Sequence, residues 1–264
     1  MLDDPVAYLD NACVTLKPQS VIDSIQDYYI NTPGCGGRSV HRYGTHVSKT
    51  ISQSRIKLAH FLSSPSVNEI VFTRNATHSL NQIAKGLEWN KGDVVLTTDR
   101  EHNSNLVPWL QLEQEQGIDH RIVRSNQDNT FNLESFEEAC AEAGSNLKMV
   151  SMSHVGNLDG VEIPVKDITK IAKDYGALVS IDGAQSAPHM SVDVQDLGID
   201  FYSFSIHKML GPSGMGGLWG RTELLENMRT IQSGGQTVTS STYESLEWVI
   251  SGCRSLSNQD FSSA

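Results

Sequence analysis

Lys208 is the residue whose surroundings most clearly favour covalent chemistry. It follows an apolar segment, directly succeeds His207, and is followed by the glycine-containing stretch GPSG at 211–214. Most lysines are solvated at the surface, and that ordinary interpretation applies to a lysine taken alone. Glycines next to a lysine indicate a close approach of the backbone to another group. A lysine amine held there loses water, and such an amine can form a Schiff base with an aldehyde.

Asp182 supplies the complementary group. The apolar run ALVSID ends on this carboxylate, and Gly183 and Gln185 follow. A carboxylate in that position can cap a helix or bind a loop, but a buried one needs a cationic or hydrogen-bonding partner. The protonated nitrogen of a pyridine ring is such a partner, and its protonation makes the ring an electron sink. A lysine for the aldehyde and an aspartate for the ring nitrogen are what pyridoxal phosphate requires.

Candidate phosphate donors stand near the ends of two other apolar segments. Thr77 lies where EIVFT gives way to a helical pattern, and Ser205 and His207 immediately precede Lys208. A helix N-terminus with hydroxyl donors binds phosphate; the alternative is that Thr77 only caps the helix. His102 follows a further apolar segment and offers an imidazole that can stack on a flat ring, although a lone histidine is more often structural.

Alternating strand-like and helix-like segments provide the framework for these residues. We expect a mostly parallel sheet covered by helices on both faces, an α/β fold. Parallel strands place their carboxyl ends at one edge, so the candidate residues should meet there. The predicted strands are 69–73, 94–98, 148–155, 177–182, 201–205 and 216–220, and the predicted helices are 74–89 and 167–176, the latter closed by Gly176.

Composition excludes several classes of protein. The 264 residues contain 31 Asp and Glu against 20 Lys and Arg, a net charge of −11, which disfavours nucleic acid or an anionic membrane as partner. No apolar run is long enough to span a bilayer, and the first residues do not resemble a signal peptide. The four cysteines form no CxxC pair, so we expect reduced thiols, no metal site and a cytoplasmic location.

Seven short motifs together resemble the class V aminotransferase group of fold-type I pyridoxal-phosphate enzymes. Within that group the chain is most similar to the SUF-type cysteine desulfurases and selenocysteine lyases. The motifs occur in the family's order, and the resemblance covers nearly all of the chain to about residue 250. They are YLDNACVTLKP (8–18), RYGTH (42–46), EIVFTRNATHSLN (69–81), EHNSNLVPW (101–109), HVGNLDG (154–160), IDGAQSAPH (181–189) and DFYSFSIHKMLGPSGMGGLWG (200–220).

The resemblance implies a role for each candidate residue. Lys208 matches the lysine that bonds to the cofactor, Asp182 the partner of the pyridine nitrogen, and Gln185 the residue that hydrogen-bonds the phenolic oxygen. His102 matches the histidine that stacks on the ring and relays protons. The remaining matches are Thr77, Ser205 and His207 as phosphate ligands and Asn157 as a contact of the cofactor or the substrate carboxylate.

The chain departs from the family pattern in three places. Asn103 stands where the family usually has a second histidine, and Ala76 where it often has a hydroxyl residue. The third departure is at the C-terminus, where the family continues into a smaller domain with a nucleophilic cysteine and a carboxylate-binding arginine. We therefore expect an N-terminal segment (1–40), a cofactor-binding large domain (41–250) and an irregular tail (251–264) in place of most of the small domain.

The resemblance implies conversion of L-cysteine to L-alanine with transfer of sulfur to an acceptor protein, as in iron–sulfur cluster assembly, by a homodimer. None of Cys13, Cys35, Cys140 and Cys253 matches the family's nucleophile, so sulfur transfer by this chain is expected to be impaired. Two alternatives stay open. One is another class V reaction, namely transamination, epimerisation or kynureninase-type cleavage; the other is a non-catalytic fragment that binds the cofactor or dimerises.

Overall fold

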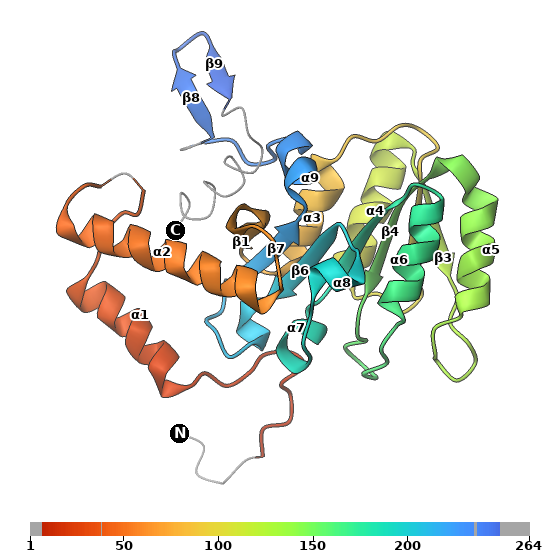
Figure 1. Ribbon diagram of the computed structural model, residues 1–264, viewed down its shortest axis with the longest axis horizontal. Helices are drawn as coiled ribbons and strands as arrows, with labels where there is room; N and C mark the ends of the chain where they lie inside the picture. The colour runs from red at the N-terminus through yellow and green to blue at the C-terminus, as the bar shows by residue number, and fades with distance from the viewer. Residues whose placement is uncertain (1–6, 38, 235–236, 249–264) are drawn as a thin grey trace.

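A seven-stranded sheet forms the centre of the computed structural model, which describes residues 7–37, 39–234 and 237–248 (Figure 1). Its strand order is β1-β7-β6-β5-β4-β2-β3. β7 is antiparallel to both of its neighbours, and the other pairs are parallel. The strands are β1 (Ile70–Thr73), β2 (Val94–Thr98), β3 (Asp119–Val123), β4 (Leu147–Ser153), β5 (Leu178–Asp182), β6 (Phe201–Ser205) and β7 (Gly216–Gly220).

The mostly parallel α/β architecture is the one the sequence predicts. All six expected strands form, and six of the seven strands run in one direction, so their carboxyl ends share one edge. β3 was not predicted. Its sequence, DHRIV, places three polar residues before two apolar ones, and only Val123 is buried, so it lacks the apolar run of a central strand.

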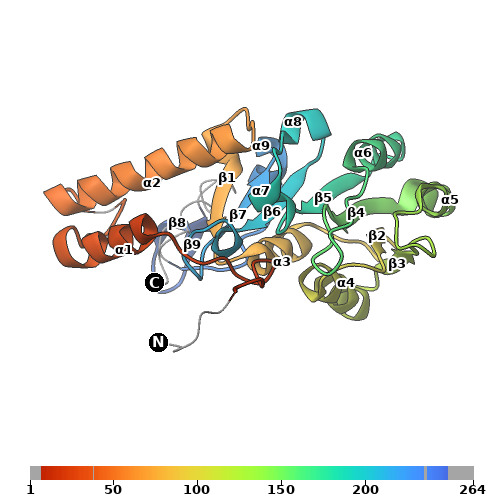
Figure 2. The same cartoon turned by 90° about the horizontal axis from the view of Figure 1, so that it is seen from below.

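Helices cover both faces of the sheet (Figure 2). Side chains alternate along each strand, so that Val94 and Leu96 join one hydrophobic cluster and Val95 joins the other. α2, α5 and α6 contribute to the first cluster, and α3, α4 and α9 to the second. The helices are α1 (Gln19–Asn31), α2 (Arg42–Phe61), α3 (Ala76–Gly86), α4 (Asn103–Gln116), α5 (Leu133–Ala143), α6 (Val165–Asp174), α7 (Ser186–His189), α8 (Val194–Leu197) and α9 (Thr222–Asn227).

Two predicted helices exist with altered boundaries. The helix expected over 74–89 is α3, which begins at Ala76, and its N-cap is Asn75, whose side chain accepts a hydrogen bond from His78 N. Thr77 as the cap is therefore wrong, because it already lies in the first turn. The helix expected over 167–176 is α6, which begins two residues earlier. Gly176 follows it with φ +77°, a left-handed conformation that ends helices.

The ends of the described chain lie outside the sheet. α1 has no buried residue and lies beside α2 in both views (Figures 1 and 2). A short hairpin, β8 (Val238–Ser241) with β9 (Leu246–Trp248), ends the described part of the chain and was not predicted. The predicted irregular tail at 251–264 lies outside the described residues, and the predicted division into three parts stays a prediction. Among the described residues, the helices are too short or too polar to cross a bilayer.

Candidate active site

Lys208, Asp182 and His102 come together at the carboxyl edge of the sheet. Asp182 is the last residue of β5, Lys208 ends a 3₁₀ turn (Ile206–Lys208) directly after β6, and His102 lies between β2 and α4. The Lys208 charge acts on both of the others, because it is among the causes that lower the pKa of His102 and oppose the rise in the pKa of Asp182. The parallel topology thus brings His102 close to Asp182 and Lys208, which lie 80 and 106 positions further along the chain.

Asp182 is a buried carboxylate, with 4% of its surface exposed. Burial raises its pKa. The rise is opposed by a hydrogen bond from Ala184 N, which is 2.9 Å from Oδ1, by the Lys208 charge and by a hydrogen bond from Ser104. A carboxylate kept from water in this way is stabilised by a cation at its free lone pairs. The ring nitrogen of a protonated pyridine meets that requirement.

His102 is the N-cap of α4, and part of its ring stays exposed at the edge of the sheet. Its Nδ1 accepts a hydrogen bond from Ser104 N at 3.1 Å and lies 2.8 Å from Ser104 Oγ. Because Nδ1 accepts, the neutral ring carries its proton on Nε2. Partial burial and Lys208 lower the pKa of His102, whereas Glu101 opposes this change. The imidazole is therefore favoured in its neutral form, which suits stacking on a ring.

Ser205 and Thr77 lie on either side of the junction between β6 and α3. Ser205 is buried, and its Oγ accepts a hydrogen bond from Ala76 N at 2.9 Å. Thr77, which follows Ala76 in the chain, is exposed in the first turn of α3. A Cβ on Gly216 would lie 2.5 Å from Asn75 Cα, so this glycine permits β7 to approach the start of the helix. The positive end of an 11-residue helix and two hydroxyls together make a site suited to phosphate.

The N-terminal segment reaches over the 3₁₀ turn that carries His207 and Lys208. The carbonyl oxygen of His207 accepts hydrogen bonds from Thr15 N, Thr15 Oγ1 and Lys17 Nζ at 3.2, 3.0 and 2.7 Å. Thr15 Oγ1 also accepts from Leu210 N at 2.9 Å. Burial, Lys208 and Lys17 lower the pKa of His207. Thr15 and Lys17 were missed as contacts, although the motif at 8–18 that contains them carried part of the resemblance.

Gln185 and Asn157 are less closely joined to the group. Gln185 is buried, and its Nε2 donates to Ala12 O at 2.8 Å, so its amide is engaged with the N-terminal segment. Asn157 lies partly buried in the turn after β4. Within the described chain no hydrogen bond joins Asn157 to the other candidates. Their roles as cofactor or substrate contacts stay predictions.

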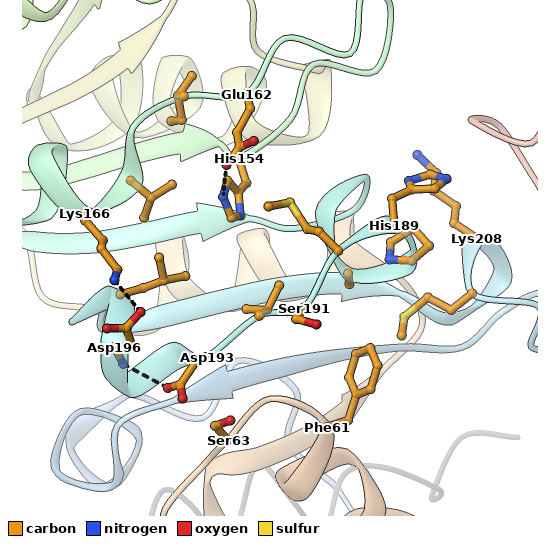
Figure 3. Close-up of a pocket in the computed structure, with 18 of the residues that line it drawn as sticks. Phe61, Ser63, His154, Glu162, Lys166, His189, Ser191, Asp193, Asp196 and Lys208 are labelled. Carbon is orange, nitrogen blue, oxygen red and sulfur yellow. Dashed lines mark hydrogen bonds and ion pairs between the residues drawn. The ribbon is translucent and has the colours of Figure 1, made fainter.

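An open cavity of about 1350 Å³ adjoins Lys208 on the side of the sheet that α2, α6 and α8 cover. Figure 3 shows Lys208 and His189 at one end and Lys166 and Asp196 at the other. Asp182, His102 and Ser205 do not line it. The cavity is therefore a neighbour of the candidate site and not the place where its titratable groups converge.

The cysteines of the described chain differ in reactivity. Burial, with a contribution from Glu137, raises the pKa of Cys140 to about 12, so this thiol stays protonated at neutral pH. Cys13 and Cys35 are exposed free thiols. Cys253 lies outside the described residues. Over the same part of the chain, no three His, Cys, Asp or Glu side chains are grouped as metal ligands would be.

Comparison with known proteins places these features in a family. The model of the aminotransferase class-V family matches residues 7–252. A probable cysteine desulfurase from Halalkalibacterium halodurans is 38% identical over 256 residues, which are 94% of this chain and 62% of that protein. A cysteine desulfurase from Haloferax volcanii is 37% identical over 248 residues, covering 92% of this chain and 58% of that protein.

Solved structures agree with the sequence comparisons. A cysteine desulfurase from Thermococcus onnurineus, determined in its apo form, superposes with a TM-score of 0.88 at 34% identity, covering 95% of this chain and 62% of that one. A cysteine desulfurase from Escherichia coli superposes with a TM-score of 0.84 at 30% identity, covering 95% of this chain and 66% of that one. The chain thus spans about three-fifths of the length of these relatives.

Proposed function

The chain belongs to the class-V aminotransferase family, and from that membership we propose that it is the cofactor-binding part of a pyridoxal-phosphate enzyme of the cysteine desulfurase type. The family and the fold-type I large domain expected from the seven motifs are confirmed by the comparisons. The observation that carries the proposal is the meeting of Lys208, Asp182 and His102 at one sheet edge, next to the N-terminus of α3.

The chemistry of this set of residues fits pyridoxal phosphate. The cofactor has an aldehyde, a basic ring nitrogen, a phenolic oxygen and a phosphate. Lys208 would bind it through its amine, Asp182 through the ring nitrogen and Gln185 through the phenolic oxygen. Thr77, Ser205 and the first turn of α3 would hold the phosphate, with His207 and Asn157 as further contacts. The buried carboxylate of Asp182 supports the assignment most strongly, because it lies beside a cation and would be stabilised by a second one.

When bound, the cofactor supplies an electron sink that stabilises negative charge at the α-carbon of an amino acid. The chain's own residues then have separate tasks. Asp182 would keep a proton on the ring nitrogen. His102 would shield the ring from water. Lys208, with its amine free, would take the substrate's α-proton on Nζ.

The proposed substrate is L-cysteine, with L-alanine as product and sulfur passed to an acceptor. Two considerations support cysteine. The relatives named above are cysteine desulfurases, and a further structure with a TM-score of 0.80 and 28% identity is a complex with cysteine. The acceptor protein, a role in iron–sulfur cluster assembly, a homodimeric assembly and a cytoplasmic location are part of the same proposal.

The proposal is tested by adding pyridoxal phosphate to the 264-residue chain and recording its visible absorbance. Bonding of the cofactor to a lysine amine shifts its band to longer wavelength, and we expect that shift in the parent chain but not in Lys208→Ala. Lys166→Ala is the matched control. Lys166 lines the same cavity as Lys208, but it lies at the other end and pairs with Asp196. A band that survives Lys208→Ala, or no band in the parent, would contradict the proposal.

A further inference from the structure

Glu101, which directly precedes His102, lies at the junction of three elements. Its Oε1 accepts a hydrogen bond from Thr98 Oγ1 at the end of β2, at 2.6 Å. Its Oε2 accepts from Asn105 Nδ2 in the first turn of α4 and from Ser153 Oγ at the end of β4, both at 2.7 Å. Ser153 N is 2.9 Å from Oε2 and 3.1 Å from Oε1. One side chain therefore connects β2, β4 and α4.

The hydrogen bonds at Glu101 all run toward the carboxylate. A backbone N–H, an amide N–H and two hydroxyls act as donors, so both oxygens accept and neither needs a proton. Burial raises the pKa of Glu101, and hydrogen bonds from Thr98, Asn105 and Ser153 oppose that rise. The donor set is thus complementary to the ionised form, and charge-assisted hydrogen bonds of this kind are stronger than neutral ones.

Asn105 extends the network into the core. It is fully buried, and its Oδ1 accepts from Ser151 Oγ at 2.6 Å and from Trp109 Nε1 at 3.3 Å. Glu101 therefore binds a residue that is itself fixed to β4 and to the second turn of α4. The side chain of Glu101 is thus held by residues of β2, β4 and α4, and His102 is the next residue along the chain.

The charges of Lys208 and Glu101 act on His102 in opposite directions. Burial, the largest cause, and the Lys208 charge lower the pKa of its imidazole, whereas the Glu101 charge raises it. Asp182, the other charged group of the site, is connected to the ring through Ser104, which contacts both residues. Of these groups, Glu101 is the one that favours a proton on the imidazole.

We propose that Glu101 is a positioning residue for His102: its anchored carboxylate fixes the segment that carries the imidazole over the cofactor site and places a negative charge one residue before it in the chain. The task of His102 on the cofactor rests on the proposed function. The effect of Glu101 on the imidazole does not, because it can be measured in the chain without cofactor. Glu101 was missed as a contributor from the sequence, since its partner Ser153 is 52 residues away.

The test is the pKa of His102, measured from its imidazole NMR signals in the cofactor-free 264-residue chain, with His102→Gln used to assign the signals. We expect Glu101→Gln to shift the His102 pKa downward, because the negative charge is lost while the volume is kept. The side-chain amide of the glutamine also turns an N–H toward at least one of the groups that donate to Glu101, so that hydrogen bond is lost. Glu101→Asp keeps the charge and is expected to stay nearer to the parent value.

Glu69→Gln is the matched control. Glu69 is a buried carboxylate with a set of donors similar to that of Glu101, namely Ser64 Oγ, Trp219 Nε1 and Thr222 N and Oγ1, at 2.7 to 3.2 Å. It precedes β1 and so lies at the opposite edge of the sheet. We expect this variant to lose stability without changing the His102 pKa. An unchanged His102 pKa in Glu101→Gln, or an equal shift in Glu69→Gln, would overturn the proposal.

A reciprocal measurement applies if Glu101→Gln does not fold. Coupling between two charges acts equally on both, so the carboxyl pKa of Glu101 should be higher in His102→Gln than in the parent. An identical Glu101 pKa in the two proteins would contradict the proposal. A chain that shows the coupling but gives no visible band with pyridoxal phosphate would refute the proposed function and leave the coupling intact.

Discussion

The Oγ of Ser205 lies 2.9 Å from the backbone N of Ala76, and this contact joins the strand that leads to Lys208 to the first turn of α3. The two residues are 129 positions apart in the sequence. Because the Lys208 amine and the N-terminus of α3 are connected by one hydrogen bond and two short segments, the distance between the proposed sites for the aldehyde and the phosphate is constrained. A rigid cofactor with an aldehyde and a phosphate requires that arrangement.

The first prediction concerns Ser205→Ala. Loss of the hydrogen bond to Ala76 N should lower the free energy of unfolding by about 1 kcal/mol, and loss of the hydroxyl should weaken cofactor binding several-fold. Urea unfolding and titration with pyridoxal phosphate measure the two effects. Ser203→Ala is the control, because Ser203 lies on the same strand and its buried Oγ has no partner among the described residues. Equal losses in the two variants would argue against a specific role for Ser205.

The second prediction concerns Asp182→Asn. The fold should be retained. Burial raises the pKa of the Asp182 carboxyl group, so replacing it with a neutral amide removes the free-energy cost of keeping a charge away from water. We expect the exchange of the α-proton of alanine for deuterium, measured with the cofactor bound, to become slower. The rate should fall by about tenfold for each unit by which the pKa of the ring nitrogen decreases. The amide has nearly the same volume but does not hold that proton. Exchange as fast as in the parent would exclude the pairing of Asp182 with the ring nitrogen.

The third prediction concerns pH. Burial is the largest cause that lowers the pKa of His154 and of His120, and the carboxylates near each oppose it only in part. A histidine whose folded pKa is below its unfolded value of about 6.5 contributes stability above that value and loses it as the pH falls. The urea concentration at the midpoint of unfolding should therefore decrease as the pH is lowered from 7 to 5.5.

His154 provides the test of that cause. It is 3% exposed, and its buried Nδ1 has no hydrogen-bond partner in the described structure. His154→Gln should flatten the dependence of the urea midpoint on pH, whereas replacement of the exposed His46 should leave it as in the parent. A midpoint that is independent of pH in the parent, or that changes equally in both variants, would show that the buried histidines are not the cause.

The fourth prediction concerns sulfur. The chain is expected to release little sulfide from L-cysteine, because transfer needs a thiolate about 3–3.5 Å from the substrate sulfur. Cys140 is buried and protonated, and Cys13 is an exposed thiol that follows Ala12, whose carbonyl oxygen accepts a hydrogen bond from Gln185. Sulfide release should be measured in the parent and with each cysteine replaced by serine. Rapid release that a single replacement abolishes would identify a nucleophile and contradict the prediction.

Elements with continuous apolar runs were predictable, and contacts between distant polar groups were not. β5 and β6 could be placed because each is a short apolar run that ends on a polar residue. β3 could not, because an edge strand with one buried residue carries little periodic signal. The residue types at the strand ends and the motif resemblance together gave the candidate residues, whose roles stay predictions. The hydrogen bond from Gln185 to Ala12 joins residues 173 positions apart, which no local pattern predicts. Asn75 and Thr77 are both suitable helix caps by residue type, so the structure was needed to show that Asn75 caps α3.

The proposed bond between Lys208 and the cofactor can be measured directly by chemical trapping. The chain should be incubated with pyridoxal phosphate, reduced with borohydride, digested and mapped by mass spectrometry. We expect one stable pyridoxyl adduct on the peptide that contains Lys208, its loss in Lys208→Ala, and its persistence in Lys166→Ala. Labelling spread evenly over the lysines, or a principal adduct on a residue other than Lys208, would contradict it.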